Sequence, residues 1–407
     1  MDPTPSRTPV SIDDCTRESI ALLRANLTPH GVLAAARNKA SEARRYTRIF
    51  GRDAAICALA MCGSGDAALE AGAVASLESL AAQQAANGQI PKYVDPAGRD
   101  ADFWYLGCID ATLWWLIAVD HLRRAGAVPS DRWADAVARA LGWLHAQEHP
   151  HFRLLQQNEA SDWADIMPRS GYVLYSNALW HDVKRRFGLE GLDATRHHFN
   201  HLFHPFQRDL PQYHRARLLR HYATRGRRDP GLYLSFVNFA FAGNEGDVFG
   251  NLLAVLCGAA AESMGHRIVR TVAAAHADRP WPVRVVLQPL DRDDELWRPY
   301  MGRHQQNQVH QYHNGGLWPF VGGFWVLALA RLGLQRQARH ALQALAEANA
   351  QDGWRFTEWF HGRTLQACGM AGQSWNAATF LLARRALDGG GCPWPPGPPA
   401  NGRSGPQ

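Results

Sequence analysis

Apolar residues recur at helical spacing through most of the chain and divide it into a series of predicted helices. The segment 133–147 places Trp133, Val137 and Leu144 on one face, which is typical of a helix with one buried side. The segment 110–124 is apolar on most of its circumference. Further helices are predicted over residues 67–86, 175–187, 246–263, 322–334, 335–350 and 373–387, and the best strand-like run is 283–287.

Many apolar helices in series, joined by loops rich in Gly, Asn and aromatic residues, predict a single all-α domain. No segment repeats at a fixed period, which disfavours a solenoid. A closed ring of helical hairpins, the (α/α)6 toroid or six-hairpin barrel, is the architecture that we expect. We expect this domain to span residues 15–388, between a disordered segment at 1–14 and a disordered Pro/Gly-rich tail at 389–407.

The composition is that of a soluble globular protein, with 46% hydrophobic and 20% charged residues in a chain of 407. The net charge of +6 comes largely from residues 37–52 and 215–228, and the second run reads as a solvated loop, so we expect no nucleic-acid partner. Seven scattered cysteines without a CxxC pair disfavour a zinc ribbon. The chain shows neither an export signal nor a long apolar run, so we expect a cytoplasmic protein without membrane contact. Its oligomeric state is left open.

Residues 312–320, Tyr-His-Asn-Gly-Gly-Leu-Trp-Pro-Phe, combine aromatic rings with hydrogen-bonding side chains in one short loop before an apolar helix. Sugar rings stack their C–H faces on aromatic rings, and their hydroxyls need paired donors and acceptors once they leave water. Tyr312, His313 and Trp318 are therefore candidate sugar-binding residues. The alternative is a loop whose aromatic side chains cover the core and whose glycines make a turn.

Residues 158–171 place three carboxylates around Trp163, ahead of a Pro-Arg turn. A carboxyl group that is desolvated beside a tryptophan has a raised pKa and keeps a proton near neutrality, as a general acid requires. Asp162 and Asp165 are the two candidates, and the sequence does not decide between them. The alternative is an acidic surface loop that caps the following helix.

Residues 356–362 place a single acidic residue, Glu358, between aromatic residues. Aromatic flanks limit access of water and could hold a carboxylate that activates one water molecule; an ordinary backbone cap is the alternative. One protonated and one ionised carboxyl group is the arrangement that glycoside hydrolysis uses. Asp53, Asp110 and Gln373 lie in further polar motifs: Asp110 is either a helix N-cap or a clamp for sugar hydroxyls, and Asp53 is either a substrate ligand or the ion-pair partner of the adjacent arginine.

His197, His201 and His204 are spaced i, i+4 and i+7, and would lie on one face of a helix. Three imidazoles on one face can bind a transition metal. The run is basic and carries no glutamate in the spacing of a zinc-protease motif, so we expect no metal site. The chain also lacks a phosphate-binding glycine-rich loop and a GxSxG nucleophile elbow.

Taken together, these motifs resemble those of the six-hairpin glycoside hydrolases. The loop 312–319 is similar to the YHNGG-WP loop of neutral/alkaline invertases and to the related loop of the amylo-α-1,6-glucosidase domain of glycogen-debranching enzymes. Shorter similarities lie at residues 50–53, 109–115, 163–165, 168–169, 177–180 and 249–252. The resemblance spans residues 45–385, and the stretch 196–228 matches no motif of either group.

The resemblance implies an inverting hydrolase that cleaves an α-glucosidic bond in a small oligosaccharide and needs neither metal nor cofactor. Asp165 would be the general acid and Glu358 the general base. The substrate-binding residues would be Asp53, Asp110, Trp163, Arg169, Tyr312, His313, Trp318 and Gln373. Two alternatives remain: a sugar epimerase, isomerase or phosphorolytic enzyme on the same barrel, with His313 and His361 as candidate bases, or a non-catalytic sugar-binding protein. The exact substrate and linkage are left open.

Overall fold

The computed structural model describes residues 10–97, 99–206, 216–224 and 229–394, and it is built mainly of helices. The strands it contains are short and form small sheets of two or three. A helix-rich fold is therefore confirmed. None of the helices in these ranges is long and apolar enough to cross a membrane.

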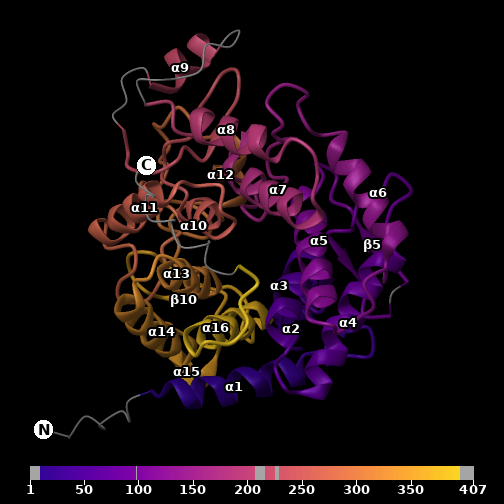
Figure 1. The fold of residues 1–407 in the computed structure, drawn as a ribbon. Coiled ribbons are helices and arrows are strands. Elements are labelled where there is room, and N and C mark those ends of the chain that lie inside the picture. Colours follow the sequence, from indigo (N-terminus) through magenta and orange to yellow (C-terminus); the bar gives the residue numbers. More distant parts are fainter. Residues whose placement is uncertain (1–9, 98, 207–215, 225–228, 395–407) are drawn as a thin grey trace, which may run out of the picture.

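Six helices contact one another in cyclic order around the centre of the molecule (Figure 1). They are α3 (Gly51–Met61), α5 (Ile109–Arg124), α7 (Leu174–Phe187), α10 (Val248–Leu256), α13 (Pro319–Arg331) and α16 (Ser374–Leu387). Each packs on the next, and α16 packs on α3, which closes the cycle. The close approach of α13 to α16 requires Gly323, because a Cβ atom there would lie 2.5 Å from that of Thr379.

A second layer of helices lies outside this ring, and each of them packs against at least one ring helix. In the same order, α4 (Ala67–Ala82), α6 (Ala134–His145), α8 (Leu192–Leu202), α11 (Glu262–Ala274), α14 (Gln335–Asn349) and α1 (Ile12–Ala25) cover the ring. The sequence accounts for the two layers. Every residue of α3 and of α10 is buried, whereas α1 buries only the face of Cys15, Ser19 and Leu23.

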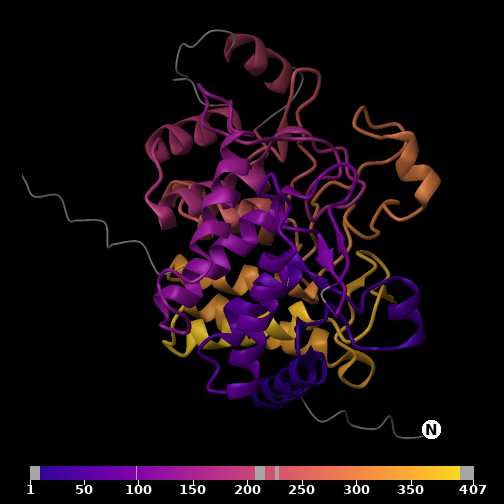
Figure 2. The same ribbon diagram turned by 90° about the vertical axis from the view of Figure 1, so that its right-hand side faces the viewer.

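Short helices and strands fill the connections between these helices. The helices are α2 (Lys39–Ala43), α9 (Ala216–Thr224), α12 (Pro299–His304) and α15 (Gln351–Trp354). The antiparallel sheets are β1–β2 (Leu27–Thr28, Gly31–Val32), β3–β4–β5 (Ile49–Phe50, Tyr93–Val94, Ala101–Asp102), β6–β7–β8 (Gln156–Gln157, Gly171–Val173, Phe236–Val237) and β9–β10 (Trp359–Phe360, Ala367–Cys368). In Figure 2 the segment around α12, in orange, projects from the right-hand side of the molecule.

Several expected elements differ from those observed. Residues 246–263 were expected to be one helix, but α10 ends at Leu256 and α11 begins at Glu262. Residues 283–287 form isolated bridges with residues of other loops rather than a strand. Helix α1 begins at Ile12, and Trp394, which follows Gly389, is buried, so both lie in segments that were expected to be disordered. Residues 1–9 and 395–407 lie outside the described residues.

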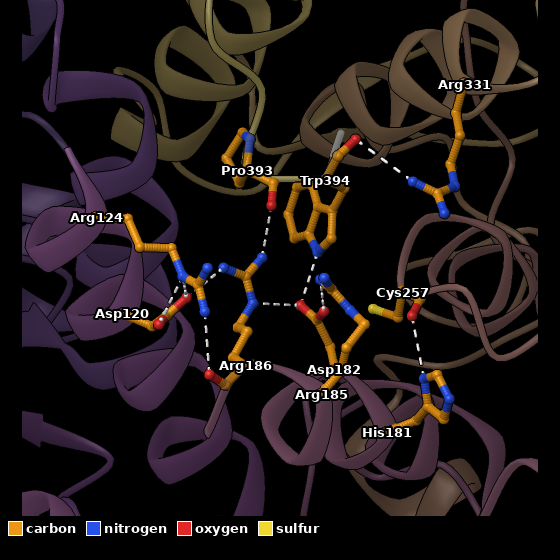
Figure 3. A network of polar contacts seen from close by, with 10 residues as sticks. All are labelled: Asp120, Arg124, His181, Asp182, Arg185, Arg186, Cys257, Arg331, Pro393 and Trp394. Atoms are coloured by element: carbon orange, nitrogen blue, oxygen red, sulfur yellow. Dashed lines mark hydrogen bonds and ion pairs between the residues drawn. The ribbon is translucent and has the colours of Figure 1, made fainter. Parts of the chain in front are cut away.

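A buried polar network lies at the C-terminal ends of the ring helices (Figure 3). Asp182 of α7 accepts hydrogen bonds from Arg186 Nε at 2.8 Å and from Trp394 Nε1 at 2.8 Å. Arg186 also donates to the Pro393 carbonyl at 2.7 Å and to Asp120 of α5 at 3.0 Å. The segment that follows α16 is therefore held across the end of the ring by charge-assisted hydrogen bonds, which are stronger than neutral ones.

Replacing Trp394 by Phe is expected to lower the free energy of unfolding by about 1–2 kcal/mol, because a buried carboxylate loses one donor while the ring contacts are largely kept. Denaturant unfolding measures this change. Trp133→Phe is the matched control, since Trp133 donates to Glu78, whose side chain is 46% exposed and returns to water. Equal losses in the two variants would contradict a special role for the bond to Asp182.

Candidate active site

A cavity of about 320 Å³ lies at the N-terminal ends of ring helices α3, α13 and α16, and the small β3–β4–β5 sheet forms part of its wall. Its lining residues are Arg44, Arg45, Tyr46, Phe50, Arg52, Asp53, Lys92, Tyr93, Asp102, Trp104, Trp163, Asp165, Tyr312, His313, Trp318, Glu358 and Trp375. A further hollow of about 650 Å³ shares several of these residues and adds Ile166, Gln305, Gln306, Gln311, Trp359 and Gly369. Both volumes are typical of pockets that bind small molecules, and we call the second one the outer hollow.

The two carboxylates singled out by the sequence line the same cavity. Asp165 comes from the loop before β7, and Glu358 from the segment before β9. Asp165 is partly open to solvent, with 28% of its side chain exposed, whereas Glu358 is 3% exposed. The fold therefore brings together one accessible and one buried carboxyl group from opposite halves of the chain.

Glu358 is held at both oxygens. The Tyr46 hydroxyl donates to Oε1 at 2.7 Å, and the backbone N–H of Met370 donates to Oε2 at 2.8 Å. Burial raises the pKa of Glu358 to about 7, although both hydrogen bonds act to lower it. The fit is close: Gly369 has a φ of +74°, and a Cβ atom there would lie 2.2 Å from Glu358 Oε2.

Asp165 faces a cation. Lys92 Nζ lies 3.7 Å from Asp165 Oδ1 and 4.1 Å from the centroid of the Trp104 ring. Burial disfavours the charge on Lys92, but its acidic neighbours, with Asp165 the strongest of them, together outweigh this effect and raise the lysine pKa. Asp165 is thus the acidic residue of its loop that a ligand in the cavity would meet.

Asp162, the other acidic candidate, points away from the cavity. It is buried, accepts a hydrogen bond from the Ala164 N–H at 2.8 Å, and accepts another from Gln157 Nε2 at 2.8 Å. Burial raises the pKa of Asp162 to about 6. Its oxygens organise the loop, so geometry favours Asp165 over Asp162 as the group that reaches a substrate.

Aromatic rings form one wall of the cavity. The His313 ring stacks on Trp318 with centroids 4.8 Å apart and an interplanar angle of 6°, and Trp163 packs edge-on against both rings. Trp375 stacks on Phe320 at 3.9 Å. The indole N–H groups of Trp163 and Trp375 are buried and have no hydrogen-bond partner among the described residues, although buried indole N–H groups usually find one.

His313 presents an unpaired imidazole to the cavity. Neither ring nitrogen has a hydrogen-bond partner among the described residues. Burial, followed by the positive charges of Arg52, Arg169 and Lys92, lowers the pKa of His313 well below its usual range. The neutral ring carries one donor and one acceptor nitrogen, which matches a sugar hydroxyl.

Asp53 and Asp110 flank Arg52 but play different parts. Asp53 Oδ2 lies 3.5 Å from Arg52 Nε, lines the cavity and accepts no hydrogen bond from the described residues, while burial raises the pKa of Asp53 to about 6. Asp110 does not line the cavity. It lies within α5, whose N-cap is Cys108, and its oxygens accept from Arg52, Tyr175 and Cys108.

Asp110, Arg169 and Gln373, which the sequence predicts as substrate-binding residues, do not line the cavity. Arg169 lies beneath the cavity, 3.3 Å from Glu245 and 3.3 Å from Asp247, because a buried guanidinium needs carboxylate partners. Gln373 is fully buried at the start of α16, and it does not line the cavity either. Tyr312, Trp163 and Trp318 do line it.

Buried Asn307 connects two of the loops that form the site. Its amide nitrogen donates to the carbonyl of Asp165 at 2.9 Å and to that of Ile166 at 3.1 Å. Its amide oxygen accepts from the backbone N–H of His313 at 3.0 Å. Asn314 in turn donates to the Asn307 carbonyl at 3.1 Å. The loop of the acid and the aromatic loop are thus fixed relative to each other.

Several residues of the cavity wall were not predicted. Tyr46, Lys92 and Trp104 reach the cavity from the loops around the β3–β4–β5 sheet, and Arg44 and Arg45 line its rim. Their segments carry no motif, and the sheet consists of two-residue strands that leave no periodic signal. Trp375 lies in a polar motif at the start of α16 that the sequence does single out.

The histidine run forms no shared site. Helix α8 ends at Leu202, so His204 does not continue the face of His197 and His201; it bonds to Asp229 at 3.2 Å instead. Across the residues that the structure describes, no cluster of three or more His, Cys, Asp or Glu side chains is arranged to hold a metal ion. The stretch 196–228 lies partly outside the described residues.

Comparison with known proteins gives two kinds of similarity. Residues 247–389 match the family model of alkaline and neutral invertases. The mitochondrial neutral/alkaline invertase 1 of Oryza sativa subsp. japonica is 27% identical over 149 residues, which are 35% of this chain and 23% of that protein. The chloroplastic alkaline/neutral invertase E of Arabidopsis thaliana is 25% identical over 145 residues, 34% of this chain and 22% of that protein. The chain thus spans less than a quarter of these relatives.

The fold similarity is wider. A GH63 mannosylglycerate hydrolase from Thermus thermophilus has a TM-score of 0.62 at 13% identity and covers 90% of this chain and 99% of its own. A wild-type glycosidase structure has a TM-score of 0.61 at 15% identity, and the similarity covers 95% of this chain and 99% of that one. The resemblance to alkaline and neutral invertases is therefore confirmed over residues 247–389, which include the Tyr312 loop and Glu358.

Proposed function

We propose that the protein is a glycoside hydrolase that cleaves an α-glucosidic bond in a small oligosaccharide with inversion, in the manner of a neutral invertase or an amylo-α-1,6-glucosidase. The observation that carries the proposal is the shared cavity of Asp165 and Glu358, which are 358 − 165 = 193 positions apart in the chain. The invertase-like sequence around Glu358 supports it. A cytoplasmic location remains the prediction from the sequence.

We also assign the fold to the (α/α)6 barrels. The cyclic contacts of α3, α5, α7, α10, α13 and α16, and the outer helix against each, support this assignment. In such a ring the loops at one end gather side chains from the whole chain. The cavity lies at the N-terminal ends of the ring helices, and the network around Trp394 lies at their C-terminal ends.

The proposed reaction is a single displacement. Asp165 gives its proton to the glycosidic oxygen as the bond between that oxygen and the anomeric carbon breaks. Glu358 accepts a proton from a water molecule whose oxygen bonds to the anomeric carbon from the opposite face. Lys92, 3.7 Å from Asp165, would stabilise the carboxylate that remains after the proton has left.

Two observations bear on which residue is the base. A pKa of about 7 for Glu358 suits either role, because such a group is present in both forms at neutral pH. The partners of Glu358 favour the base: Tyr46 O–H and Met370 N–H both donate to it, and such hydrogen bonds stabilise the ionised form. Both carboxyl groups line the outer hollow, but Asp165, with 28% of its side chain exposed against 3% for Glu358, is the one more accessible to a leaving group.

Substrate recognition would use the unpaired polar atoms of the cavity. Asp53 Oδ2, both nitrogens of His313 and the indole N–H groups of Trp163 and Trp375 lack partners among the described residues. Buried polar atoms without partners cost free energy, so a bound ligand that supplies hydroxyls repays that cost. Trp318 and Tyr312 supply ring faces. No step of this reaction requires a metal or cofactor.

Turnover assays with sucrose, maltose and isomaltose, with and without phosphate, test the proposal. Release of two sugars independent of phosphate is the expected result, and Asp165→Asn should abolish it. Isomerisation without cleavage, or cleavage only with phosphate, would favour the alternative enzymes. Of the histidine pair proposed for an isomerase, His313 lines the cavity and His361 does not. Binding without turnover would leave a sugar-binding protein.

Replacing Tyr46 by Phe is expected to move the acidic limb of the pH profile of kcat/KM upward by about one unit. The tyrosine donates to the Glu358 carboxylate, so its loss raises the pKa of Glu358, and a hydrogen bond to a charged group is worth about 1.5–3 kcal/mol. Because a base must be ionised, activity at pH 6 should fall further than activity at pH 8.

Tyr93→Phe is the control, because the Tyr93 hydroxyl lines the same cavity but bonds to Arg45. In this variant the acidic limb of the pH profile of kcat/KM should stay where it is in the unmodified protein. An unchanged limb in Tyr46→Phe, with activity lowered equally at every pH, would mean that Tyr46 acts on the substrate rather than on Glu358.

A further inference from the structure

A second cavity, of about 1300 Å³, opens on the outside of the helical ring between α11 and α14 (Figure 1 labels both helices, with α13 between them). We call it the α11–α14 groove. Its lining residues are His266, Val269, Arg270, Ala273, His276, Asp278, Arg279, Pro280, Trp325, Leu329, Leu334, Arg336, Gln337, His340, Ala341 and Ala344. None of them lines the proposed active site, so the groove is a separate feature of the molecule.

The groove has an apolar floor and a cationic rim. Trp325 and Leu329 of α13 are buried at its base, together with Val269 and Ala341 from the two walls. The rim carries three guanidinium groups, Arg270 on α11, Arg336 on α14, and Arg279 on the loop after α11. A single carboxylate, Asp278, faces them, so the formal charge of the groove is positive when the imidazoles are neutral.

Two of these guanidinium groups are unengaged. Within the described ranges Arg270 and Arg336 form neither an ion pair nor a hydrogen bond, and both are exposed. Asp278 lies 4.0 Å from Arg279 Nε and so offsets that charge rather than the other two. Guanidinium groups on opposite walls, each with a free set of donors, match an anion with several acceptor oxygens.

Trp325 adds an independent observation. Its side chain is 2% exposed and lines the groove, yet its indole N–H has no hydrogen-bond partner among the described residues. An unpaired buried donor costs about 1–3 kcal/mol, and buried indole N–H groups normally find an acceptor. An acceptor supplied by a bound molecule at the floor of the groove would satisfy it.

We propose that the α11–α14 groove binds a small organic phosphate. The groove carries four side chains that can only donate hydrogen bonds, three guanidiniums and one indole, against a single carboxylate acceptor. This excess of donors favours a ligand rich in acceptor oxygens and negative charge. A phosphate monoester or polyphosphate carries about two or more negative charges, which the two walls can share. The apolar floor and the volume call for an organic part attached to the phosphate, since an inorganic ion would leave them unfilled.

Isothermal titration calorimetry of the full chain tests this proposal, with adenosine triphosphate as the probe. Adenosine, which lacks the charged phosphates, and inorganic phosphate, which lacks the organic part, are the two control ligands. We expect binding of the triphosphate in the micromolar range, at least about 100-fold weaker binding of either counterpart, and weakening by added salt. This result does not depend on glycosidase activity, so it can succeed or fail independently of the proposed function.

Single variants locate the site. Arg270→Gln and Arg336→Gln are each expected to weaken triphosphate binding by at least about tenfold, and Trp325→Phe, which keeps an aromatic ring without the N–H, by about fivefold. Arg339→Gln is the matched control, because Arg339 is exposed on the same helix and does not line the groove. Thermal unfolding checks that each variant is folded.

Four results would overturn the proposal: no binding at millimolar triphosphate, equal affinity for adenosine, equal weakening by Arg339→Gln and by the two groove variants, or loss of binding in Arg44→Gln alone. Arg44 lines the rim of the proposed active site, so the last result would place the anion there instead. Weakening confined to the three groove variants would establish the site.

Discussion

Replacing Glu358 by Gln is expected to lower kcat by at least about a thousandfold, because the amide cannot accept a proton from the attacking water. The substitution keeps the size of the side chain, so the cavity and its aromatic wall should remain. KM should change little, since the buried Glu358 is held by Tyr46 and Met370 and is not proposed to bind the sugar. Steady-state kinetics on the best substrate of the panel measures both constants.

Asp165→Asn is the matched variant, and the two variants should respond differently to a change of leaving group or nucleophile. A substrate with a good leaving group, such as a nitrophenyl glycoside, needs little acid assistance, so it should restore much of the turnover of Asp165→Asn and little of that of Glu358→Gln. Azide, a small anionic nucleophile that needs no base, should rescue Glu358→Gln through the inverted glycosyl azide. The opposite pattern would exchange the two roles, and full turnover in either variant would remove that residue from the mechanism.

Replacing Arg169 by Met is expected to lower the free energy of unfolding by about 3–5 kcal/mol, because it leaves two buried carboxylates without their counter-ion. Glu245 and Asp247 lie 3.3 Å from the guanidinium, and all three side chains are at most 2% exposed. Burial already raises the pKa of Asp247, and Arg169 opposes that rise. Without Arg169 the carboxyl would bind its proton more tightly in the folded state.

The loss of stability in Arg169→Met is expected to depend on pH. A group whose pKa is higher in the folded than in the unfolded protein stabilises the fold at low pH and loses that effect as pH rises. The deficit of Arg169→Met should therefore be smaller at pH 5 than at pH 8 in denaturant unfolding. Arg298→Met is the control, since Arg298 pairs at 3.2 Å with a Glu159 that is 30% exposed, and it should cost at most about 1 kcal/mol. A stable Arg169→Met with a raised KM would restore the substrate-binding role expected from the sequence.

The sequence predicted four of the six ring helices closely. Helices α5, α7, α13 and α16 begin within three residues of their predicted starts, because long apolar runs bounded by polar loops leave few alternatives. The break between α10 and α11 was missed. Residues 257–261 are small and apolar, so they continue the helical pattern without a polar signal to mark the turn at Gly258.

The site was predicted in part, for a physical reason. Asp165, Glu358 and the Tyr312 loop stand in dense motifs, and the fold places all three at one cavity. Arg169 has the same local pattern as a substrate ligand, but its partners, Glu245 and Asp247, come from a distant part of the chain that no local pattern reveals. Lys92 and Tyr46 reach the cavity through short strands and loops, whose positions depend on tertiary packing alone.

The anomeric configuration of the first glucose released from an α-glucoside tests the central claim most directly. If Glu358 activates a water molecule opposite to the leaving group protonated by Asp165, proton NMR in the first minutes of hydrolysis will show β-glucose ahead of mutarotation. If α-glucose appears first, the reaction passes through a covalent intermediate, and the assignment of an acid and a base acting across a water-filled gap is wrong.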